Sequence, residues 1–191
     1  MSTGRIGWHN DATRYGRVSI AFHWIVVALV VIQWLLGEAM TDWFESDKEL
    51  SFALFQYHKS VGFLILFVVL ARLVWRLREP VPAPPPDQPR WQTRLAVIVH
   101  WGLYLLLLGL PISGWLTVST SKYKDLPIRF FGLFEIPKLM GPDKKLHDIF
   151  GEVHEVMVTL LLILLALHVA GALYHHFVRR DDVLKRMLGR A

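Results

Sequence analysis

Histidines recur at seven-residue intervals along the last apolar segment of the chain. They are His147, His154, His168 and His175, with Leu161 at the one intervening position. Seven residues advance a helix by about 700°, so each side chain lies within about 20° of the previous one, and the four imidazoles share one stripe. Imidazoles bind metals or move protons, and ionisable groups inside a membrane bundle are costly. The stripe therefore indicates a functional site.

The composition limits the chemistry of such a site. The chain has 191 residues, of which 53% are hydrophobic, with nine His, no Cys and a formal net charge of +5. The absence of Cys excludes disulfides, thiolate zinc sites, c-type haem attachment and cysteine-ligated iron–sulfur clusters. A metal must therefore be held by His, Met or carboxylate groups. Nothing in the sequence favours binding to nucleic acid.

Four apolar stretches are each about 20 residues or longer, which is the length needed to cross the hydrocarbon layer. They cover about 19–39, 52–73, 95–118 and 151–178. The proline-rich residues 79–89 cannot be helical and form a short, stiff spacer between the second and third stretches. We expect a single all-α domain, residues 1–191, built as a four-transmembrane-helix bundle in a lipid bilayer.

The positive charges predict the orientation of this bundle. Thirteen Lys and Arg residues flank the apolar stretches on the side of the two termini, against seven on the opposite side. Cytoplasmic loops carry the excess of Lys and Arg, so both termini are expected to be cytoplasmic.

The histidines that are expected inside the predicted bundle fall at two depths. His23 and His168 lie at similar levels near the cytoplasmic side, and His58 and His154 lie near the outer side. Each level therefore holds imidazoles from two different helices. His100 lies at nearly the same level as His23, and spacing alone does not decide which of them is the partner of His168.

Paired imidazoles at two levels favour haem over a bare metal ion. A bare ion needs three or four converging ligands, whereas a porphyrin supplies four nitrogens and needs only two axial imidazoles. The two levels are 14 residues apart on the last helix, about 21 Å, which leaves room for two haems with Leu161 in the apolar layer between them. Six-coordinate iron has no open site and suits electron transfer. A non-redox protein whose histidines relay protons or bind zinc is the alternative.

The histidines near the ends of the chain are expected to lie outside these levels. His147 is expected in a loop or at the interface, and His9 in a disordered tail. His175 and His176 lie at the cytoplasmic boundary, where snorkelling into the interface and contact with a quinone head group or a haem propionate both remain open.

Several motifs in this order resemble the bacterial cytochrome b561 family, whose superfamily includes the cytochrome b subunits of nickel hydrogenases and formate dehydrogenases. The motifs are Arg14-Tyr-Gly-Arg with His23-Trp24, Tyr57-His58-Lys-Ser-Val-Gly62, Ala71-Arg72 with Arg76, His100-Trp-Gly-Leu-Tyr104, Leu110-Pro111-Ile-Ser-Gly114, Val153-His154-Glu155, Leu167-His168 and Tyr174-His175-His176. The resemblance covers almost the whole chain from about 14 to 186, and residues 120–145 are the least similar to the family.

The resemblance implies two haem b groups and their axial ligands. His23 and His168 would hold the cytoplasmic-side haem, and His58 and His154 the outer haem, while the family position of His100 is not usually a ligand. Arg72 would face the cytoplasmic haem edge, where it contacts a propionate or a quinone, or would face the lipid headgroups. Headgroups are the expectation for Arg76.

The function implied by the resemblance is transmembrane electron transfer in the bacterial inner membrane. The donor would be a small anion or a redox protein at the outer side, and the acceptor a quinone. The specific version is an oxidoreductase that oxidises superoxide with ubiquinone as acceptor, and no catalytic residue is assigned. Six cations in residues 120–145 could attract an anion, although the first outer loop is acidic. The alternative is a cytochrome b subunit that passes electrons for a larger redox complex.

Overall fold

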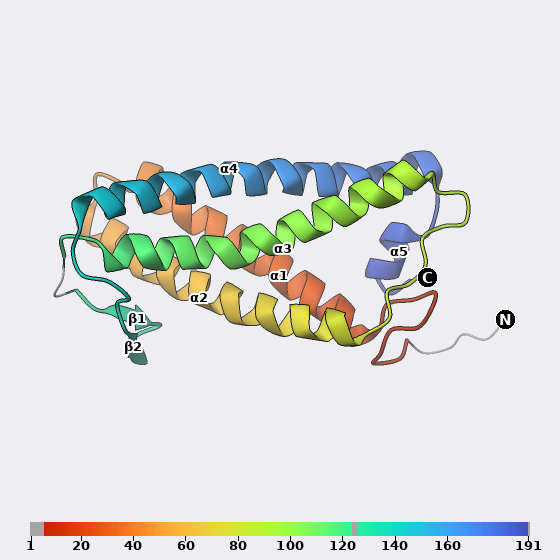
Figure 1. Cartoon of the computed structure of the whole chain (residues 1–191), viewed down its shortest axis with the longest axis horizontal. Coiled ribbons are helices and arrows are strands. Elements are labelled where there is room, and N and C mark those ends of the chain that lie inside the picture. The colour runs from red at the N-terminus through yellow and green to blue at the C-terminus, as the bar shows by residue number, and fades with distance from the viewer. Residues whose placement is uncertain (1–5, 124–125, 191) are drawn as a thin grey trace.

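Four long helices form an elongated bundle with short elements at both ends (Figure 1). The computed structural model describes residues 6–123 and 126–190. The long helices are α1 (Arg17–Glu38), α2 (Lys48–Arg78), α3 (Arg90–Ser119) and α4 (Lys144–Tyr174), and α1 and α4 continue as the π-helical turns η1 (Ala39–Trp43) and η2 (His175–Arg179). The short elements are strands β1 (Ile128–Phe130) and β2 (Phe134–Ile136) and helix α5 (Val183–Met187). The first and last described residues, 6 and 190, lie at one end of the bundle (Figure 1).

All four long helices are long and apolar enough to cross a membrane, which confirms the predicted fold class. α2 and α4 begin earlier than the apolar stretches predicted at 52–73 and 151–178. The reason is an aspartate cap at each start. Asp47 and Asp143 each accept a hydrogen bond, 3.0 Å long, from the backbone N–H three residues further on. Hydropathy marks only the part of a helix that meets lipid, so it does not locate these caps.

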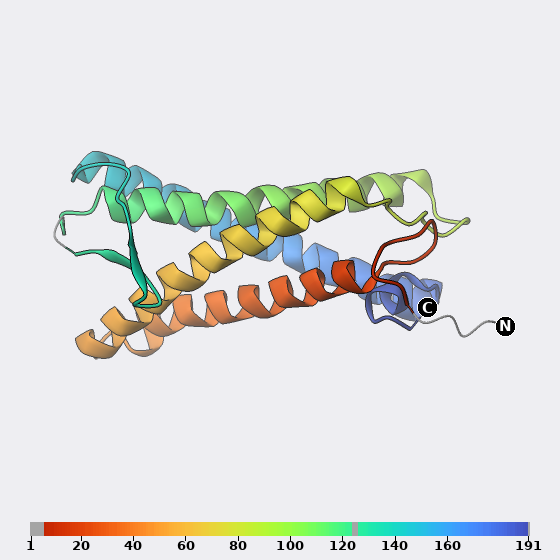
Figure 2. The ribbon, with the colours of Figure 1, turned by 90° about the horizontal axis from the view of Figure 1, so that it is seen from below.

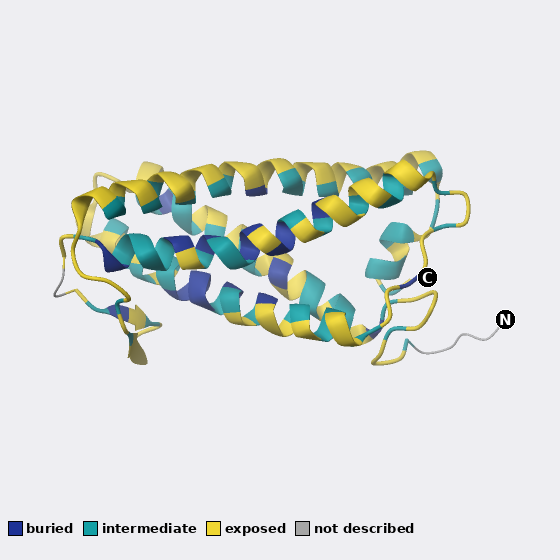
Figure 3. Ribbon diagram, viewed as in Figure 1, coloured by how far each residue is buried: buried dark blue, intermediate teal, exposed yellow. Residues whose placement is uncertain are grey.

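The helices pack in chain order, α1 against α2, α2 against α3 and α3 against α4. Their buried side chains include Val69 on α2, Leu103 and Leu107 on α3, and Leu161, the buried residue of α4. Figure 3 shows that the buried residues face the interior, while the outward faces of the helices are exposed. Those outward faces carry many large apolar side chains, as expected for helices surrounded by lipid.

The N-terminal segment folds back on the end of α2 instead of forming the disordered tail predicted for His9. The His9 imidazole lies 2.8 Å from a Glu79 carboxylate oxygen, and the Asn10 N–H donates to the other oxygen at 2.8 Å. The His9 ring also stacks on Trp75, with 5.3 Å between ring centroids. The prediction for His9 is wrong because its partners lie about 70 residues away in the sequence, where local composition carries no signal.

Acid should release this segment. The pKa of Glu79 lies below its usual value of 4.5, first because of the hydrogen bond from His9 and then because of the Asn10 N–H. A lowered carboxylate pKa stabilises the folded segment above pH 4.5, and this contribution is lost as the pH falls below 4.5 towards the lower folded value. A spin label on Ala12→Cys should therefore become mobile in EPR spectra below about pH 4.5. The same label in a Glu79→Gln background should be mobile at every pH, and a label that stays immobile in that background would contradict the assignment.

At the opposite end of the bundle, residues 120–145 contain a small antiparallel hairpin. Strand β1 pairs with β2 in the register Ile128↔Ile136 and Phe130↔Phe134. The hairpin packs on α2, where Ile128 is 1% exposed. Figure 2 shows it crossing in front of the bundle at the end away from the chain termini.

Candidate functional site

His58 on α2 and His154 on α4, the predicted outer pair, line one cavity of about 730 Å³. All four long helices contribute to its walls, and most of the lining is apolar. The lining includes Val30 and Gly37 from α1, Gly62 from α2, Leu107 and Gly114 from α3, and Leu161 from α4. The volume falls within the range of about 300–1,000 Å³ that is common for ligand and cofactor sites.

Ser113 determines which nitrogen of His154 carries the proton. The Ser113 hydroxyl donates to the backbone carbonyl of Leu110 at 2.9 Å, and its oxygen lies 2.9 Å from Nδ1 of His154. A hydroxyl has one proton, so we assign Nδ1–H of His154 as the donor to Ser113. Nε2 then carries the lone pair that a metal takes, and the hydrogen bond at Nδ1 orients the ring.

His58 has an incomplete set of partners. The Gln33 amide nitrogen lies 3.0 Å from Nε2 of His58 and donates to it. Nδ1 of His58 and Oε1 of Gln33 are buried without a hydrogen-bond partner among the described residues. Leaving a buried polar atom unpaired costs about 1–3 kcal/mol. Unpaired atoms beside a large cavity fit a site whose partner is a bound group.

Three histidines meet at the level that the sequence predicts to be on the cytoplasmic side. The ring centroids of His23 and His168 are 6.1 Å apart, and those of His100 and His168 are 5.2 Å apart. The structure therefore brings together the pair implied by the family resemblance, and it also brings the rival His100 into contact with His168.

The two ring-centroid distances differ in whether a metal would fit between the rings. Bonds between a metal and an imidazole nitrogen are about 2.0–2.1 Å long, so two imidazoles on opposite sides of one metal have ring centroids roughly 6 Å apart. The distance between His23 and His168 has this value. The edge-to-face contact of His100 with His168 is closer than this. In the described part of the chain no three His, Asp or Glu side chains converge on a site for a bare metal ion.

Two arginines of α2 lie beside the inner histidines. A guanidinium nitrogen of Arg72 is 3.4 Å from Nδ1 of His23. The guanidinium carbons of Arg72 and Arg76 lie 5.5 and 5.9 Å from the centroid of the Tyr104 ring. Arg76 thus packs over an aromatic ring of α3. Two adjacent cations at this level suit a carboxylate or another anion.

The two outermost members of the histidine stripe have local protein partners. Nδ1 of His175 lies 2.6 Å from a carboxylate oxygen of Asp181, and both side chains are mostly buried. His147, in the first turn of α4, donates from Nδ1 to the carbonyl of Thr117 at 2.8 Å. Only His154 and His168 of the stripe therefore face histidines of other helices among the described residues.

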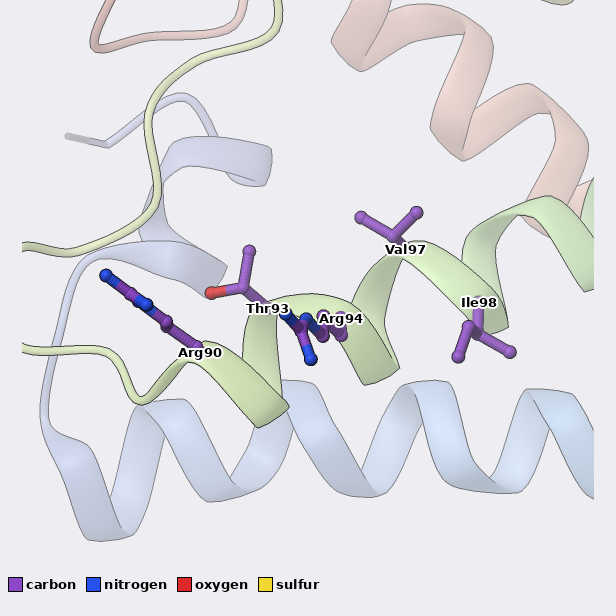
Figure 4. A pocket seen from close by; sticks show the side chains of 5 residues that line it. All are labelled: Arg90, Thr93, Arg94, Val97 and Ile98. Atoms are coloured by element: carbon purple, nitrogen blue, oxygen red, sulfur yellow. The ribbon is translucent and has the colours of Figure 1, made fainter.

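A second pocket, of about 460 Å³, lies on the inner half of α3. Figure 4 shows its lining, which is Arg90, Thr93, Arg94, Val97 and Ile98. Its side chains come from one helix and include no histidine, so it does not contribute to either histidine level.

Sequence reasoning missed Gln33 and Ser113, the two polar neighbours of the outer histidines. Each is an uncharged polar residue within an apolar span. Polar residues inside a membrane bundle commonly face its interior and pair with functional groups. That signal was available, but it does not say which histidine each residue meets.

A membrane-spanning four-helix bundle with half-buried histidines paired between helices at two levels has the architecture of a b-type membrane cytochrome. The model of the family described as prokaryotic cytochrome b561 matches residues 14–190. The chain belongs to this family, and it is a multi-pass protein of the bacterial inner membrane that binds b-type haem.

Curated relatives match over almost their whole length. "Cytochrome b561 homolog 2" of Escherichia coli (strain K12) is 36% identical over 95% of this chain and 95% of its own, and "Cytochrome b561 homolog 1" of the same organism is 27% identical over 93% and 98%. "Probable superoxide oxidase CybB" of Yersinia pestis is 30% identical over 92% of this chain and 96% of its own.

The residues present fit b-type haem. The outer cavity is large and mostly apolar, His58 and His154 both lie in its wall, and Ser113 leaves Nε2 of His154 as an acceptor. Glycine lies against each imidazole, since a Cβ on Gly114 would be 3.3 Å from Cε1 of His154 and one on Gly37 would be 3.7 Å from Cε1 of His58. The close approach of backbone to ring limits how each imidazole can tilt.

Proposed function

We propose that the chain is a free-standing di-haem cytochrome that carries electrons across the inner membrane, with both termini in the cytoplasm. The observation that supports it best is the arrangement of two imidazole pairs, each contributed by different helices, at levels 14 residues apart on α4. His58 and His154 would be the axial ligands at the outer level. His23 and His168 would be the axial ligands at the inner level.

The protein itself would supply the ligands of the haem iron, bury the haem groups and set the charge around them. A haem iron with two axial imidazoles takes up and releases single electrons without binding oxygen. Ser113 keeps His154 in the tautomer that ligates and raises the basicity of its ligating nitrogen. Leu161 and the apolar side chains around it form a dry layer between the two levels, and they exclude water and ions from the path of the electron.

At the inner level, Arg72 and Arg76 would hold anionic groups. Their guanidinium groups lie together over Tyr104, and Arg72 contacts His23 only at 3.4 Å, a long distance for a hydrogen bond. A propionate of the inner haem or a quinone oxygen would be a stronger partner for Arg72. His175, already held by Asp181, is the second candidate contact for a quinone.

We propose superoxide as the donor and ubiquinone as the acceptor. Two superoxide anions would each lose one electron and leave as O₂, and one quinone would take up the two electrons and two protons to form quinol. One relative carries the name of a superoxide oxidase. Lys59 lies in the wall of the outer cavity, and a cation at that place would attract a small anion.

Stopped-flow spectroscopy tests this proposal. Superoxide mixed with the oxidised, haem-loaded protein should give reduced haem bands within the mixing experiment, and added ubiquinone should reoxidise them. Haem that stays oxidised after mixing with superoxide would contradict the assignment of superoxide as the electron donor. Reduction that quinone does not reverse would leave the donor correct and the acceptor wrong.

A further inference from the structure

The hairpin of residues 128–136 presents an exposed apolar tip. Leu133 is 77% exposed, Phe134 is 55% exposed and Phe131 is 40% exposed. They occupy the turn and the start of β2, and the hairpin projects sideways from the bundle (Figure 1). Neighbouring large apolar side chains on a soluble surface usually mark an interaction site.

At the turn that forms this tip, Phe131 adopts a backbone conformation that is unfavourable for a residue with a bulky side chain. Phe131 has φ of +48° and Gly132 has φ of +76°, and the Leu133 N–H donates to the Phe130 carbonyl at 2.9 Å. Two successive positive φ angles define a type I′ turn, which favours Asn or Asp followed by Gly. A bulky residue in the left-handed region costs about 1–2 kcal/mol. The Phe131 ring packs edge-to-face on Phe130, with 4.9 Å between ring centroids, and still leaves 40% of the residue exposed.

Hydrogen bonds to α2 fix the position of the hairpin along that helix. Oγ of Ser60 accepts the N–H of Phe131 at 3.0 Å, and its hydroxyl lies 3.0 Å from two acceptors, the carbonyl oxygens of Arg129 and Gln56. Ser60 is buried, and residues 60–71 of α2 contain no charged side chain. The hairpin is thus held at the level where the continuous apolar surface of α2 begins. Ile128, at its base, lines the outer cavity.

The charged side chains of the hairpin strands lie on the face opposite Phe130 and Phe134. Alternation along a strand places Arg129 and Glu135 opposite the face of Phe130 and Phe134, and the two form a cross-strand ion pair at 3.4 Å. The apolar side chains of the tip match the acyl-chain side of the membrane boundary.

We infer that the tip of this hairpin, Phe131 to Phe134, inserts into the outer leaflet of the bilayer and that its partner is phospholipid. The apolar tip extends the lipid-facing surface of the spans. Because β1 also forms part of the wall of the outer cavity, lipid would hold that wall in place against α2.

Spin labels at single introduced cysteines test the insertion, since the natural chain has no Cys. The full-length, haem-loaded protein is reconstituted in vesicles of phosphatidylethanolamine and phosphatidylglycerol, with a label at Leu133→Cys or, as the matched control on the charged face, at Glu135→Cys. EPR power saturation compares access of each label to oxygen, which concentrates in lipid, with access to a water-soluble nickel chelate. The label at 133 should be accessible to oxygen and protected from nickel, and the label at 135 should show the reverse.

Two results would overturn the inference. If the label at 133 is as accessible to nickel as the label at 135, the tip lies in water. If the label at 133 is protected from both reagents and shows dipolar coupling to a second label, the tip contacts another copy of the chain. An unchanged haem spectrum in both variants establishes that the labelled proteins are folded. The experiment is independent of the electron donor and acceptor.

Discussion

Alanine in place of His168 should remove the inner haem and leave the outer haem bound. His168 is the α4 residue whose ring lies 6.1 Å from that of His23, and a haem held by these two residues would bind far more weakly after the loss of one of them. The haem content per chain should fall from about two to about one. A pyridine haemochrome assay with quantitative protein determination measures it, and EPR of the oxidised protein shows which low-spin signal is lost.

His100→Ala is the matched control for this prediction. His100 is half-buried at the same level, and its ring centroid lies 5.2 Å from that of the same His168, yet it should be dispensable for haem content. His23→Ala should behave like His168→Ala. If His100→Ala loses a haem and His23→Ala keeps both, then the inner pair is His100 with His168 and our assignment is wrong.

Leucine at Gly114 should prevent binding of the outer haem without removing any ligand. A Cβ at this position would lie 3.3 Å from Cε1 of His154, and the rest of the side chain would enter the cavity of about 730 Å³ between the helices. The shift of the His154 ring and the lost space together should lower occupancy of the outer haem by about tenfold or more, the scale of effects from disturbing the neighbours of a metal ligand. Redox titration of the reduced α-band should then show one component in place of two.

Gly171→Leu is the control for added volume at a helical glycine. Gly171 is also in a membrane-spanning helix, but no described atom lies within 4 Å of the place its Cβ would take. This variant should keep both haems. Retention of the inner haem in Gly114→Leu shows that the bundle is still assembled, so a protein with full outer haem content would contradict the placement of that haem in the cavity.

The four spans and the two histidine levels could be predicted because both depend on local properties of the chain. The length of an apolar run is set by the thickness of the hydrocarbon layer, and the phase of His154 and His168 is set by the helical repeat. Leu161 lies in the buried core, and its place in an apolar layer between two haems stays a prediction. His9 was mispredicted because its partner Glu79 comes from a distant segment.

Sequence by itself determined the helices, their lengths in the membrane, and the depth at which each histidine lies. The tertiary structure decided which side chains meet at that depth. His23 and His100 are equivalent by depth, and only the positions of α1 and α3 around α4 separate a 6.1 Å ring distance from one of 5.2 Å. The same holds for Gln33 beside His58 and Ser113 beside His154. Depth along a helix follows from the rise per residue, whereas contact between helices depends on their rotation and spacing, which side chains from the whole bundle set together.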